Sequence, residues 1–336
     1  NDKTIKLVCN MIYEMLFKSR IREKDLEIER NVVIQEYNQM VDTPDEYVNE
    51  IIEEFAFEGH PLGKSVIGTK KTINNITKKD IDQFYKSNYK YSNMFISITG
   101  NFPHRYRGII EKMFIKSELK KELLTKPTIE IYPFNTKIKK SPLKYVRRKL
   151  EQNLLSILFP IGGVYDPKLN HYRIIENILG GNMSSRLFVR IREELGLAYG
   201  IHCSKSIYEE AGYFEISTKT EPNNTLKCLK NILKELQKIK NKKISSKELK
   251  DNQKNYSDIF KTGFDYLENV ADYYSEQYFF NSKKETMEDR IKNIKKITTQ
   301  EIKDCANQLF DFNKMMVVCY GECQEKKLLN VIEQFT

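Results

Sequence analysis

The 336-residue chain has no tryptophan and only 14 glycines, 9 prolines, six cysteines and four histidines. With 40% hydrophobic and 30% charged residues, this composition excludes collagen-like repetition and a disordered chain. The longest apolar runs, at 154–161 and 315–320, have strand length and fall short of the ~18 to 20 residues that a membrane helix needs. We therefore expect a soluble globular protein. The missing tryptophan is a compositional bias that excludes no chemistry.

Six cysteines are too few, in a chain of this length, for the dense disulfide framework of small secreted domains. We expect reduced and mostly buried thiols, which favours a reducing compartment such as the cytoplasm or an organelle matrix. Cys319 and Cys323 are close in sequence, but no histidine or further cysteine nearby completes a zinc-ligand pattern. A metal site at this pair is therefore not expected.

The net charge of +10 permits anionic partners, but only through the overall electrostatic field. Seven lysines and arginines fall within residues 137–149, where a solvated linker is the plainer explanation. Nucleic-acid binding would need interleaved aromatic residues or a recognised module there. Charge alone thus identifies no ligand.

An internal repeat organises the chain. Residues 76–100 begin with a threonine N-cap, continue as an apolar-periodic helix and end in a β-rich run stopped by glycine. Residues 297–321 follow the same order, 221 positions later and without a gap. We interpret the two segments as copies of one α+β unit, with strands expected at 94–99 and 315–320.

The repeat predicts the domain organisation. Residues 1–119 would be the remainder of an N-terminal domain, 120–149 a linker, and 150–336 a homologous C-terminal domain whose first core strand covers 154–160. If the copies have similar lengths, roughly seventy residues of the first copy precede residue 1.

Residues 22–40 read as a helix that ends at Thr43-Pro44. Glu29 and Glu36 are seven positions apart, so they share a face, and Val32, Val33 and Met40 make that face apolar. Buried there, the carboxylates would need an arginine, hydrogen-bond donors or a cation. A structural salt bridge or a solvated edge is the plainer explanation of the two carboxylates, and a metal site is the more specific alternative. Adding 221 maps these residues to Lys250 and Ser257, so only the first copy carries the carboxylates.

The next helix has an acidic face. It presents Glu46, Glu50, Glu53 and Glu54. Attraction of basic peptides is one interpretation, but a solvated helix surface is the plainer one.

Several separated motifs, in the same order, resemble the pitrilysin/insulinase family of zinc peptidases, in the shorter branch that includes the mitochondrial processing peptidase subunits. The first copy contributes Glu29-Arg30-Asn31-Val32-Val33-Ile34-Gln35-Glu36, Gly59-His60-Pro61-Leu62-Gly63 and Ile67-Gly68-Thr69. The second contributes Leu179-Gly180-Gly181-Asn182-Met183-Ser184-Ser185-Arg186-Leu187-Phe188 and Arg192-Glu193-Glu194-Leu195-Gly196-Leu197-Ala198-Tyr199.

This resemblance implies an inverted zinc motif, H-x-x-E-H, whose histidines bind zinc while its glutamate activates water. The third zinc ligand of the family corresponds to Glu36. Glu29 corresponds to an additional acidic residue that orients the site. Arg192 and Tyr199 match a pair that reaches toward the substrate and the developing oxyanion. Residues 180–186 resemble a loop at the cavity mouth, for which a glycine helix cap is the bland alternative.

None of the four histidines belongs to an H-x-x-E-H motif; they are His60, His104, His171 and His202. His60 matches the H-P-L-G turn of the family. The missing motif should lie roughly seventy-five residues before the distal glutamate, within the region that the repeat places before residue 1. The chain as given therefore holds one zinc ligand and is not expected to form a catalytic site by itself.

The implied fold is α+β, with two homologous domains in a clamshell arrangement, each a mostly antiparallel sheet packed with helices. The implied activity is that of a zinc-dependent metalloendopeptidase, which cleaves peptides or unfolded protein segments held between the domains. The alternative is a non-catalytic homologue that serves as a partner or scaffold subunit of a processing peptidase. Homodimers and heterodimers both remain open, whereas nothing indicates nucleic-acid binding or membrane insertion.

Overall fold

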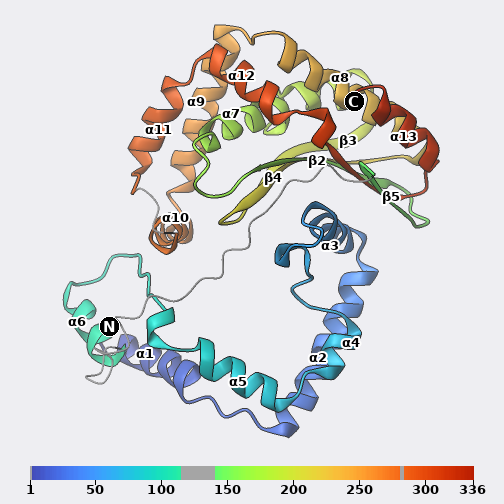
Figure 1. Ribbon diagram of the computed structural model, residues 1–336. Coiled ribbons are helices and arrows are strands. Elements are labelled where there is room, and N and C mark those ends of the chain that lie inside the picture. Colours follow the sequence, from blue (N-terminus) through green and yellow to red (C-terminus); the bar gives the residue numbers. More distant parts are fainter. Residues whose placement is uncertain (1, 115–140, 281–283) are drawn as a thin grey trace. The chain divides into compact units, whose positions relative to one another are not determined.

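The computed structural model describes residues 2–114, 141–280 and 284–336 (Figure 1). These residues form two compact units that interleave in sequence. Unit 1 consists of residues 2–43 and 65–114, and unit 2 consists of residues 44–64 with the described residues from 141 onward. The predicted linker 120–149 lies largely outside the described residues, and the predicted domain boundaries remain predictions.

Unit 1 is built from helices and contains no strand among its described residues. α1 packs against α6 through Cys9, Ile110 and Phe114, and α2 packs against α4. The helices of unit 1 are α1 (Asp2–Phe17), α2 (Glu23–Asp42), α4 (Lys70–Asn75), α5 (Lys78–Asn88) and α6 (Arg105–Phe114). The helix expected over 22–40 is thus confirmed as α2.

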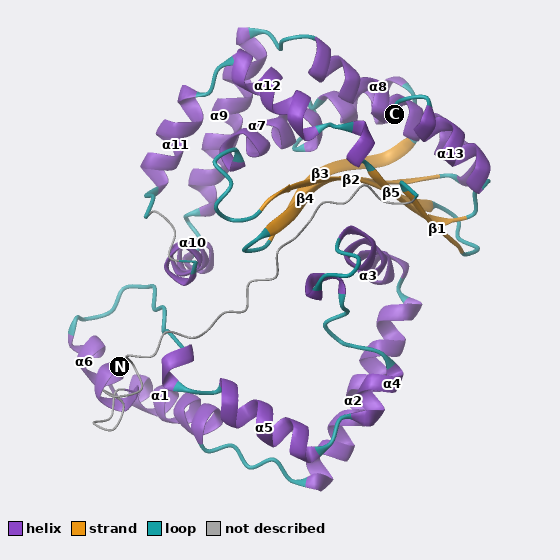
Figure 2. Ribbon diagram, viewed as in Figure 1, coloured by secondary structure: helices purple, strands orange, loops and turns teal. Residues whose placement is uncertain are grey.

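Unit 2 is organised around a five-stranded sheet with the order β1-β5-β2-β4-β3 (Figure 2). β1 and β5 run parallel, and every other neighbouring pair is antiparallel. The strands are β1 (Leu143–Arg147), β2 (Asn153–Gly162), β3 (Ala198–Ile207), β4 (Ala211–Thr220) and β5 (Met316–Gly321). This confirms the α+β class, the mostly antiparallel sheet and the strands expected at 154–160 and 315–320.

Helices cover both faces of this sheet (Figure 1). α7, α8 and α12 form one layer, whose core includes Phe159, Phe214 and Phe310. α3 covers the opposite face, where Ile52 and Phe57 pack on β2, β4 and β5. The helices of unit 2 are α3 (Pro44–Ala56), α7 (Leu169–Gly180), the π-helix η5 (Phe188–Glu194), α8 (Thr225–Asn241), α9 (Ser246–Gly263), α10 (Leu267–Phe279), α11 (Met287–Lys296), α12 (Thr299–Leu309) and α13 (Glu325–Glu333).

The repeated segments begin and end at matching positions. Thr77 caps α5 and Thr298 caps α12, each in a reciprocal capping box with an acidic side chain three residues later, as the sequence predicts. The first residues of α5 and α12 are 221 positions apart, and so are their last residues. The last residues of α4 and α11 are also 221 positions apart. These bounds favour the internal duplication, which remains a prediction.

The strand expected at 94–99 does not form in the structure, so that prediction is wrong here. In the second copy β5 pairs with both β1 and β2 and is buried along its whole length. In the first copy Phe95, Ile96 and Ile98 are exposed, and no strand lies beside them within the described part of unit 1. Because strand backbone groups need partners on neighbouring strands, this segment remains irregular.

The offset of 221 does not hold along α2. The Arg30 guanidinium donates hydrogen bonds to the carbonyls of Ile73 and Ile76. Gln253 on α9 donates to the carbonyls of Ile294 and Ile297, which lie 221 positions after Ile73 and Ile76. Arg30 and Gln253 have the same role but are 223 positions apart. The mapping of Glu29 to Lys250 and of Glu36 to Ser257 is therefore off by two residues, and their counterparts are Asn252 and Ile259. The inference that only the first copy carries these carboxylates is unaffected.

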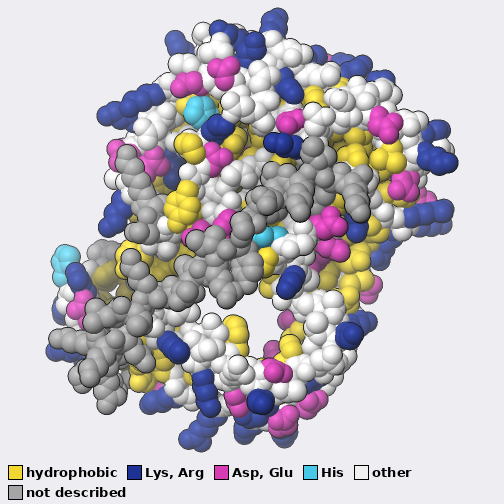
Figure 3. All heavy atoms as spheres, viewed as in Figure 1, with side chains coloured by type: hydrophobic (Ala, Val, Ile, Leu, Met, Phe, Trp, Pro, Cys, Tyr) yellow, Lys and Arg dark blue, Asp and Glu magenta, His cyan; other side chains and the backbone are white. Residues whose placement is uncertain are grey.

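Figure 3 draws one face of the molecule with the side chains coloured by type. Lysine and arginine side chains are scattered there among acidic ones. Among the helices of the described residues, none combines the length and apolar character that crossing a membrane requires.

A buried asparagine clamps the sheet of unit 2 to its surroundings. Asn153 is fully buried and donates hydrogen bonds to Thr225 Oγ1 (2.9 Å) and to the carbonyl of Glu322 (2.8 Å). Its Oδ1 accepts from the Glu322 N–H at 2.8 Å. Gly321 has φ +143°, and a Cβ there would lie 2.1 Å from Asn153 Oδ1. Glycine is therefore required where β5 turns past this side chain.

Replacing Asn153 by alanine should lower the free energy of unfolding by about 3 kcal/mol, because the N–H and C=O of Glu322 and the buried Thr225 hydroxyl lose their partner. Urea unfolding monitored by circular dichroism measures this change. Asn313→Ala, at an exposed position, is the matched control and should change stability by less than about 0.5 kcal/mol. Equal losses of stability in Asn153→Ala and Asn313→Ala would contradict the role of Asn153 in holding the sheet to its surroundings.

Candidate functional site

The two carboxylates predicted to act at a metal lie on one face of α2. Glu29 and Glu36 are both exposed, and Val32 between them is 43% exposed. The expectation that they face an apolar interior is therefore wrong for this structure. Within the described residues neither carboxylate makes a hydrogen bond or ion pair, so the salt-bridge explanation finds no partner there.

The described residues do not form a zinc site by themselves. Nowhere in residues 2–114, 141–280 and 284–336 do three or more histidine, cysteine, aspartate or glutamate side chains gather in a group that could hold a metal ion. His60 instead serves the turn at Pro61–Gly63, where its Nδ1 accepts from the Leu62 N–H at 3.2 Å. Glu36 thus stands without further ligands.

Unit 2 brings Arg192 and Tyr199 together. The guanidinium of Arg192 lies 4.7 Å from the centre of the Tyr199 ring and 4.8 Å from that of Phe188. Tyr199 is 79% exposed, whereas Phe188 is buried. Within the described residues the guanidinium forms no hydrogen bond or ion pair. Because stacking leaves the N–H edge of a guanidinium accessible, Arg192 can donate to a carbonyl or carboxylate.

Local irregularities position this pair. Arg192 lies in the π-helix η5, and Gly196, with φ +58°, turns the chain into β3. The register between β3 and β4 shifts between Ala198 and Ile201, so Tyr199 falls within a β-bulge. Thr218 Oγ1 holds the carbonyl of Gly200 at 2.7 Å on the far side of the bulge. Such bulges redirect side chains, which explains how an exposed tyrosine comes to lie over Arg192.

The predicted loop over residues 180–186 is held by structural contacts. A Cβ at Gly180 would lie 2.7 Å from the backbone nitrogen of Cys203, so glycine permits α7 to end against β3. Arg186 forms a two-pronged ion pair with Glu248 at 2.7 and 2.8 Å. Met183 is 73% exposed between these anchors. Gly181 is the C-cap residue of α7, with an ordinary right-handed φ of −85°. The position of this loop at a cavity mouth remains a prediction.

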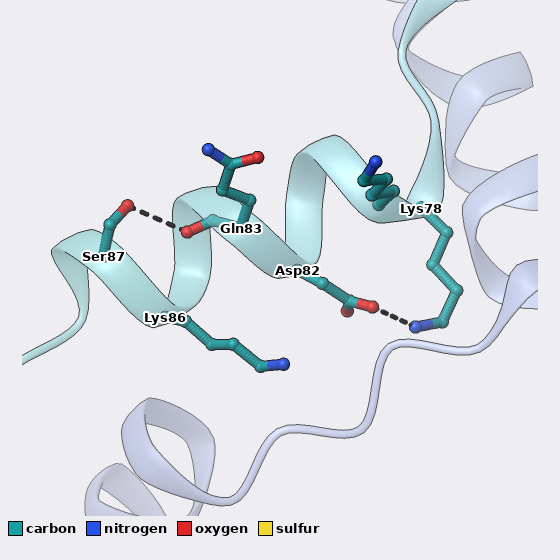
Figure 4. Close-up of a pocket in the computed structure, with 6 residues that line it drawn as sticks. Lys78, Asp82, Gln83, Lys86 and Ser87 are labelled. Atoms are coloured by element: carbon teal, nitrogen blue, oxygen red, sulfur yellow. Dashed lines mark hydrogen bonds and ion pairs between the residues drawn. The ribbon is translucent and has the colours of Figure 1, made fainter.

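A hollow of about 710 Å³ lies along α5 (Figure 4). Its lining comes from that helix alone: Lys78, Lys79, Asp82, Gln83, Lys86 and Ser87. Lys78 and Asp82 form an ion pair at 2.5 Å, and the Ser87 hydroxyl donates to the Gln83 carbonyl. Because one exposed helix face lines it, this hollow does not combine residues from several elements as a catalytic cleft does.

The half-buried position of Glu53 was not predicted from the sequence. Glu53 on α3 accepts hydrogen bonds from Tyr213 (2.7 Å) and Tyr208 (3.0 Å), and its other oxygen is buried with no partner within the described residues. Burial raises the pKa of Glu53, although both tyrosine hydroxyls act in the opposite direction and Glu50 raises it further. Burial also raises the pKa of Glu215 nearby.

The solvated-face interpretation of α3 is therefore wrong for Glu53. The sequence did contain a signal for this position. Glu53 follows Ile52 and precedes Ala56 and Phe57, and these three apolar residues are buried against the sheet. The helix pattern alone did not reveal that two tyrosines of a distant hairpin would meet this carboxylate.

Comparison with known families decides the membership of the chain. Residues 75–256, more than half of the chain, match the family model described as Peptidase M16 inactive domain. The chain belongs to the peptidase M16 family. This membership confirms the resemblance to pitrilysin/insulinase-type zinc peptidases.

Relatives of this M16 chain carry zinc protease names. An uncharacterized zinc protease of Bacillus subtilis, YmxG, is 27% identical over 312 residues, which cover 92% of this chain and 74% of that protein. Uncharacterized zinc proteases of Streptomyces coelicolor and Rickettsia felis are 27% and 29% identical over 71% and 74% of this chain. The chain spans only 52% and 57% of those two relatives.

Solved structures share the fold. A protease from Helicobacter pylori superimposes with a TM-score of 0.81 at 17% identity, covering 96% of this chain and 77% of that chain. A peptidase M16 inactive domain from Pseudomonas fluorescens gives 0.80 at 18%, covering 95% and 76%. A chain of Complex III2 from Candida albicans gives 0.78 at 14%, covering 98% and 79%. At these identities the likeness shows the fold alone.

The Glu53 carboxyl should make stability depend on pH. Because burial raises its pKa in the folded state, the folded protein binds its proton more tightly than the unfolded chain does. The free energy of unfolding should therefore fall as pH rises from the ordinary glutamate value of about 4.3 through the raised pKa. Glu53→Gln keeps an oxygen for the tyrosines but cannot ionise.

The measurement is urea unfolding of the original chain and of Glu53→Gln between pH 4 and pH 8. The variant should gain stability relative to the original chain as pH rises, while Glu46→Gln, at an exposed position of the same helix, should show no such trend. A difference that is constant across this range would refute the burial effect.

Proposed function

We propose that this chain is the larger part of a zinc-dependent metalloendopeptidase that cleaves peptides or unfolded protein segments held between two homologous domains. The H-x-x-E-H part would come from a segment outside the given sequence. The names of the relatives support the zinc protease class. One observation carries the proposal: unit 1 exposes the apolar faces whose counterparts in unit 2 are buried against a sheet.

α1 is the clearest case. Its exposed apolar side chains are Leu7, Val8, Met11, Ile12 and Met15, which are 42% to 69% exposed. Adding 221 gives Cys228, Leu229, Ile232, Leu233 and Leu236 of α8, each of which is fully buried in the core that contains β2 and β4. α1 thus has one apolar face on α6 and a second one exposed. Burying a large apolar side chain stabilises by about 1.5 to 3 kcal/mol, so the second face favours a sheet as partner.

Two further elements of unit 1 agree with α1. Phe84 on α5 is 62% exposed, and its counterpart Cys305 on α12 is buried. The exposed Ile96 and Ile98 correspond to Val317 and Cys319, which are fully buried in β5. The counterparts of these three elements, α8, α12 and β5, all contact strands within unit 2. We infer that strands equivalent to β2, β3 and β4 complete unit 1.

The order of elements indicates where those strands come from. In unit 2, β2, β3 and β4 occupy residues 153–220 and directly precede α8. By the same order, the completing strands would directly precede α1. A segment of roughly seventy residues suffices, and the family resemblance places the H-x-x-E-H motif within it.

α10 extends this argument. At the offset of 223, α3 (Pro44–Ala56) corresponds to α10 (Leu267–Phe279) from end to end. α3 covers the sheet of unit 2, whereas α10 exposes Leu267, Tyr274, Tyr278 and Phe279. α10 thus exposes an apolar face where the corresponding helix buries one.

The chain's own residues would contribute two roles. Glu36, which has no partner in the described part of the chain, would supply the third zinc ligand, and Glu29 would orient the site through hydrogen bonds to it. Arg192 would donate to the peptide carbonyl or to a substrate carboxylate, and Tyr199 would hold its guanidinium in place from above. Zinc would supply Lewis acidity, which none of these side chains provides.

A second candidate is a non-catalytic subunit that partners or scaffolds a processing peptidase. The match to the family described as an inactive domain and the shared fold with a chain of Complex III2 favour it. The two candidates differ in one property, since only the enzyme binds zinc. Absence of H-x-x-E-H from the residues encoded before residue 1, together with no stoichiometric zinc in that longer protein, would establish the second candidate.

In the longer chain that includes those residues, Glu36→Gln should abolish zinc retention and peptide cleavage while the fold survives. The reason is that a neutral amide is a poor replacement for a carboxylate ligand. Metal analysis, a quenched-fluorescent peptide assay and circular dichroism measure the three properties. Glu23→Gln, in the exposed first turn of the same helix, is the control. Full zinc content and activity in Glu36→Gln would contradict the assignment of Glu36 as a zinc ligand.

Arg192→Ala separates substrate handling from metal binding in the same assay. It should lower kcat by 10-fold or more at unchanged zinc content, because it removes a donor that acts on the substrate. Loss of zinc in this variant would show that Arg192 has a structural role instead.

If strands outside the given sequence complete unit 1, they should bury the exposed apolar face of α1. Met11→Asp should change the stability of the 336-residue chain by less than about 0.5 kcal/mol. In the longer chain it should cost about 3 kcal/mol, because the carboxylate would be buried without a partner. Urea unfolding of both chains measures the difference, with the neighbouring Asn10→Asp as control. Equal small effects in the two chains would mean that no sheet covers α1.

A further inference from the structure

The outward side of α8 carries a row of lysines. The opposite side of this helix packs into the core of unit 2, so its remaining residues reach the surface along one side. Four lysines follow that side at spacings of three or four residues, within about a quarter of the helix circumference. We call them the lysine stripe: Lys227, Lys230, Lys234 and Lys238. The exposed Lys242 and Lys243 continue the positive charge directly after the helix.

Acidic residues of α8 do not neutralise the lysine stripe. Glu235 is the single acidic residue of this helix, and it is 6% exposed and pairs with Lys238. The ammonium groups of the other three lysines form no hydrogen bond or ion pair within the described residues. The stripe therefore presents at least three uncompensated positive charges.

The elements packed on α8 do not supply the missing negative charge either. β2 and the short helix η6 (Pro222–Asn224) contain no charged residue. On η5, Glu194 pairs with Arg190 at 2.6 Å, and α13 carries two lysines and two glutamates. On α12, Glu301 is engaged in the cap of its own helix, and Lys303 offsets Asp304.

Helix stability does not explain the stripe. Like charges three or four residues apart on a helix repel each other and destabilise it. Lys227 lies in the first turn of α8, which holds no acidic residue, and there the positive end of the helix dipole disfavours a cation. Solubility would be served equally well by lysine and glutamate together. A row of one sign that the helix itself does not need is typical of a surface that attracts anions.

The chemistry of the stripe favours an anionic lipid surface over nucleic acid. The stripe has no arginine and no aromatic ring, which are the groups that hold phosphates with paired donors or stack on bases. Lysine ammonium groups are point charges that need no fixed partner geometry, as suits a layer of anionic headgroups. Since α8 is one continuous helix, the row from Lys227 to Lys238 is straight and spans about 16 Å. A flat surface can therefore meet all four lysines at once.

We propose that the lysine stripe of α8 docks the protein peripherally on an anionic lipid bilayer. The contact is electrostatic, because the apolar side chains of α8, such as Leu229, Ile232 and Leu233, are fully buried in the core of unit 2 and cannot enter the bilayer. The inference does not depend on the proposed peptidase function.

The charges predict the strength and the salt dependence of this docking. Each lysine close to an anionic bilayer raises the association constant about 5-fold, so the three unpaired lysines together give about 100-fold. Salt shortens the range of the attraction from about 10 Å at 0.1 M to about 3 Å at 1 M. Docking should therefore be reversible and lost at high salt.

The test mixes the 336-residue chain with vesicles and measures the bound fraction by sedimentation. One set of vesicles is pure phosphatidylcholine, and the other contains about 30% phosphatidylserine as the anionic lipid. At about 0.1 M salt the association constant should be at least 10-fold higher for the anionic vesicles, and this preference should disappear at about 1 M salt.

Two triple variants with the same change in net charge separate the stripe from the overall charge. The stripe variant should lose at least 10-fold in its association constant for the anionic vesicles, and it combines Lys227→Gln, Lys230→Gln and Lys234→Gln. The control variant should keep the preference, and it combines three exposed positions on other elements: Lys71→Gln, Lys90→Gln and Lys292→Gln. Circular dichroism establishes that each variant is folded. If the stripe variant does not fold, Lys234→Gln alone decides and should lower the constant about 5-fold.

Three outcomes would overturn the proposal. The first is equal binding to neutral and anionic vesicles at low salt. The second is an equal loss in the stripe and control variants, which would show that only the net charge acts. The third is tighter binding of a single-stranded RNA or a duplex DNA than of the anionic vesicles at the same salt concentration, which would assign the stripe to nucleic acid instead.

Discussion

The fold depends on one constraint: an apolar helix face and a β-strand each need a sheet beside them. Unit 2 satisfies this constraint, since β5 pairs on both sides and α8 lies buried over β2 and β4. In unit 1, helices with matching bounds expose the matching side chains, and a closely similar segment remains irregular. The same local pattern thus gives two outcomes, because strand hydrogen bonds and apolar burial come from neighbours distant in sequence.

A second consequence concerns α3. In sequence it lies between α2 and α4 of unit 1, but it packs on the sheet of unit 2 and buries Ile52 and Phe57 there. Glu53 is carried into this contact and is held by two tyrosine hydroxyls. A carboxylate in such a position ties the helix to the sheet and makes the contact sensitive to protonation.

The residues of unit 2 that we propose to handle substrate lie where regular structure breaks. Arg192 is in a π-helix and Tyr199 in a β-bulge, and the two irregularities together place a guanidinium between aromatic rings with its donors accessible. The regular helices and strands are rigid, and the π-helix and the β-bulge change the direction of side chains that regular structure would bury or keep apart.

Sequence reasoning succeeded where the decisive interaction is local. The capping boxes at Thr77 and Thr298, the helix that ends before Pro44 and the buried strand β2 follow from residues within a few positions of one another. The order of the family motifs identified the family for a similar reason, since it needs no knowledge of contacts. The α+β class then followed from alternating helix and strand patterns.

Tertiary structure alone decided the rest. It showed that the run at 94–99 lacks strand partners, that Glu53 is half-buried while Glu29 and Glu36 are exposed, and that Arg30 and Gln253 align at an offset of 223. It also showed that the Tyr145 hydroxyl holds the backbone of Cys323. Each of these facts rests on groups that are distant in sequence. Patterns of period two or 3.6 specify which residues share a face, but the partner of that face is determined only when the whole chain packs.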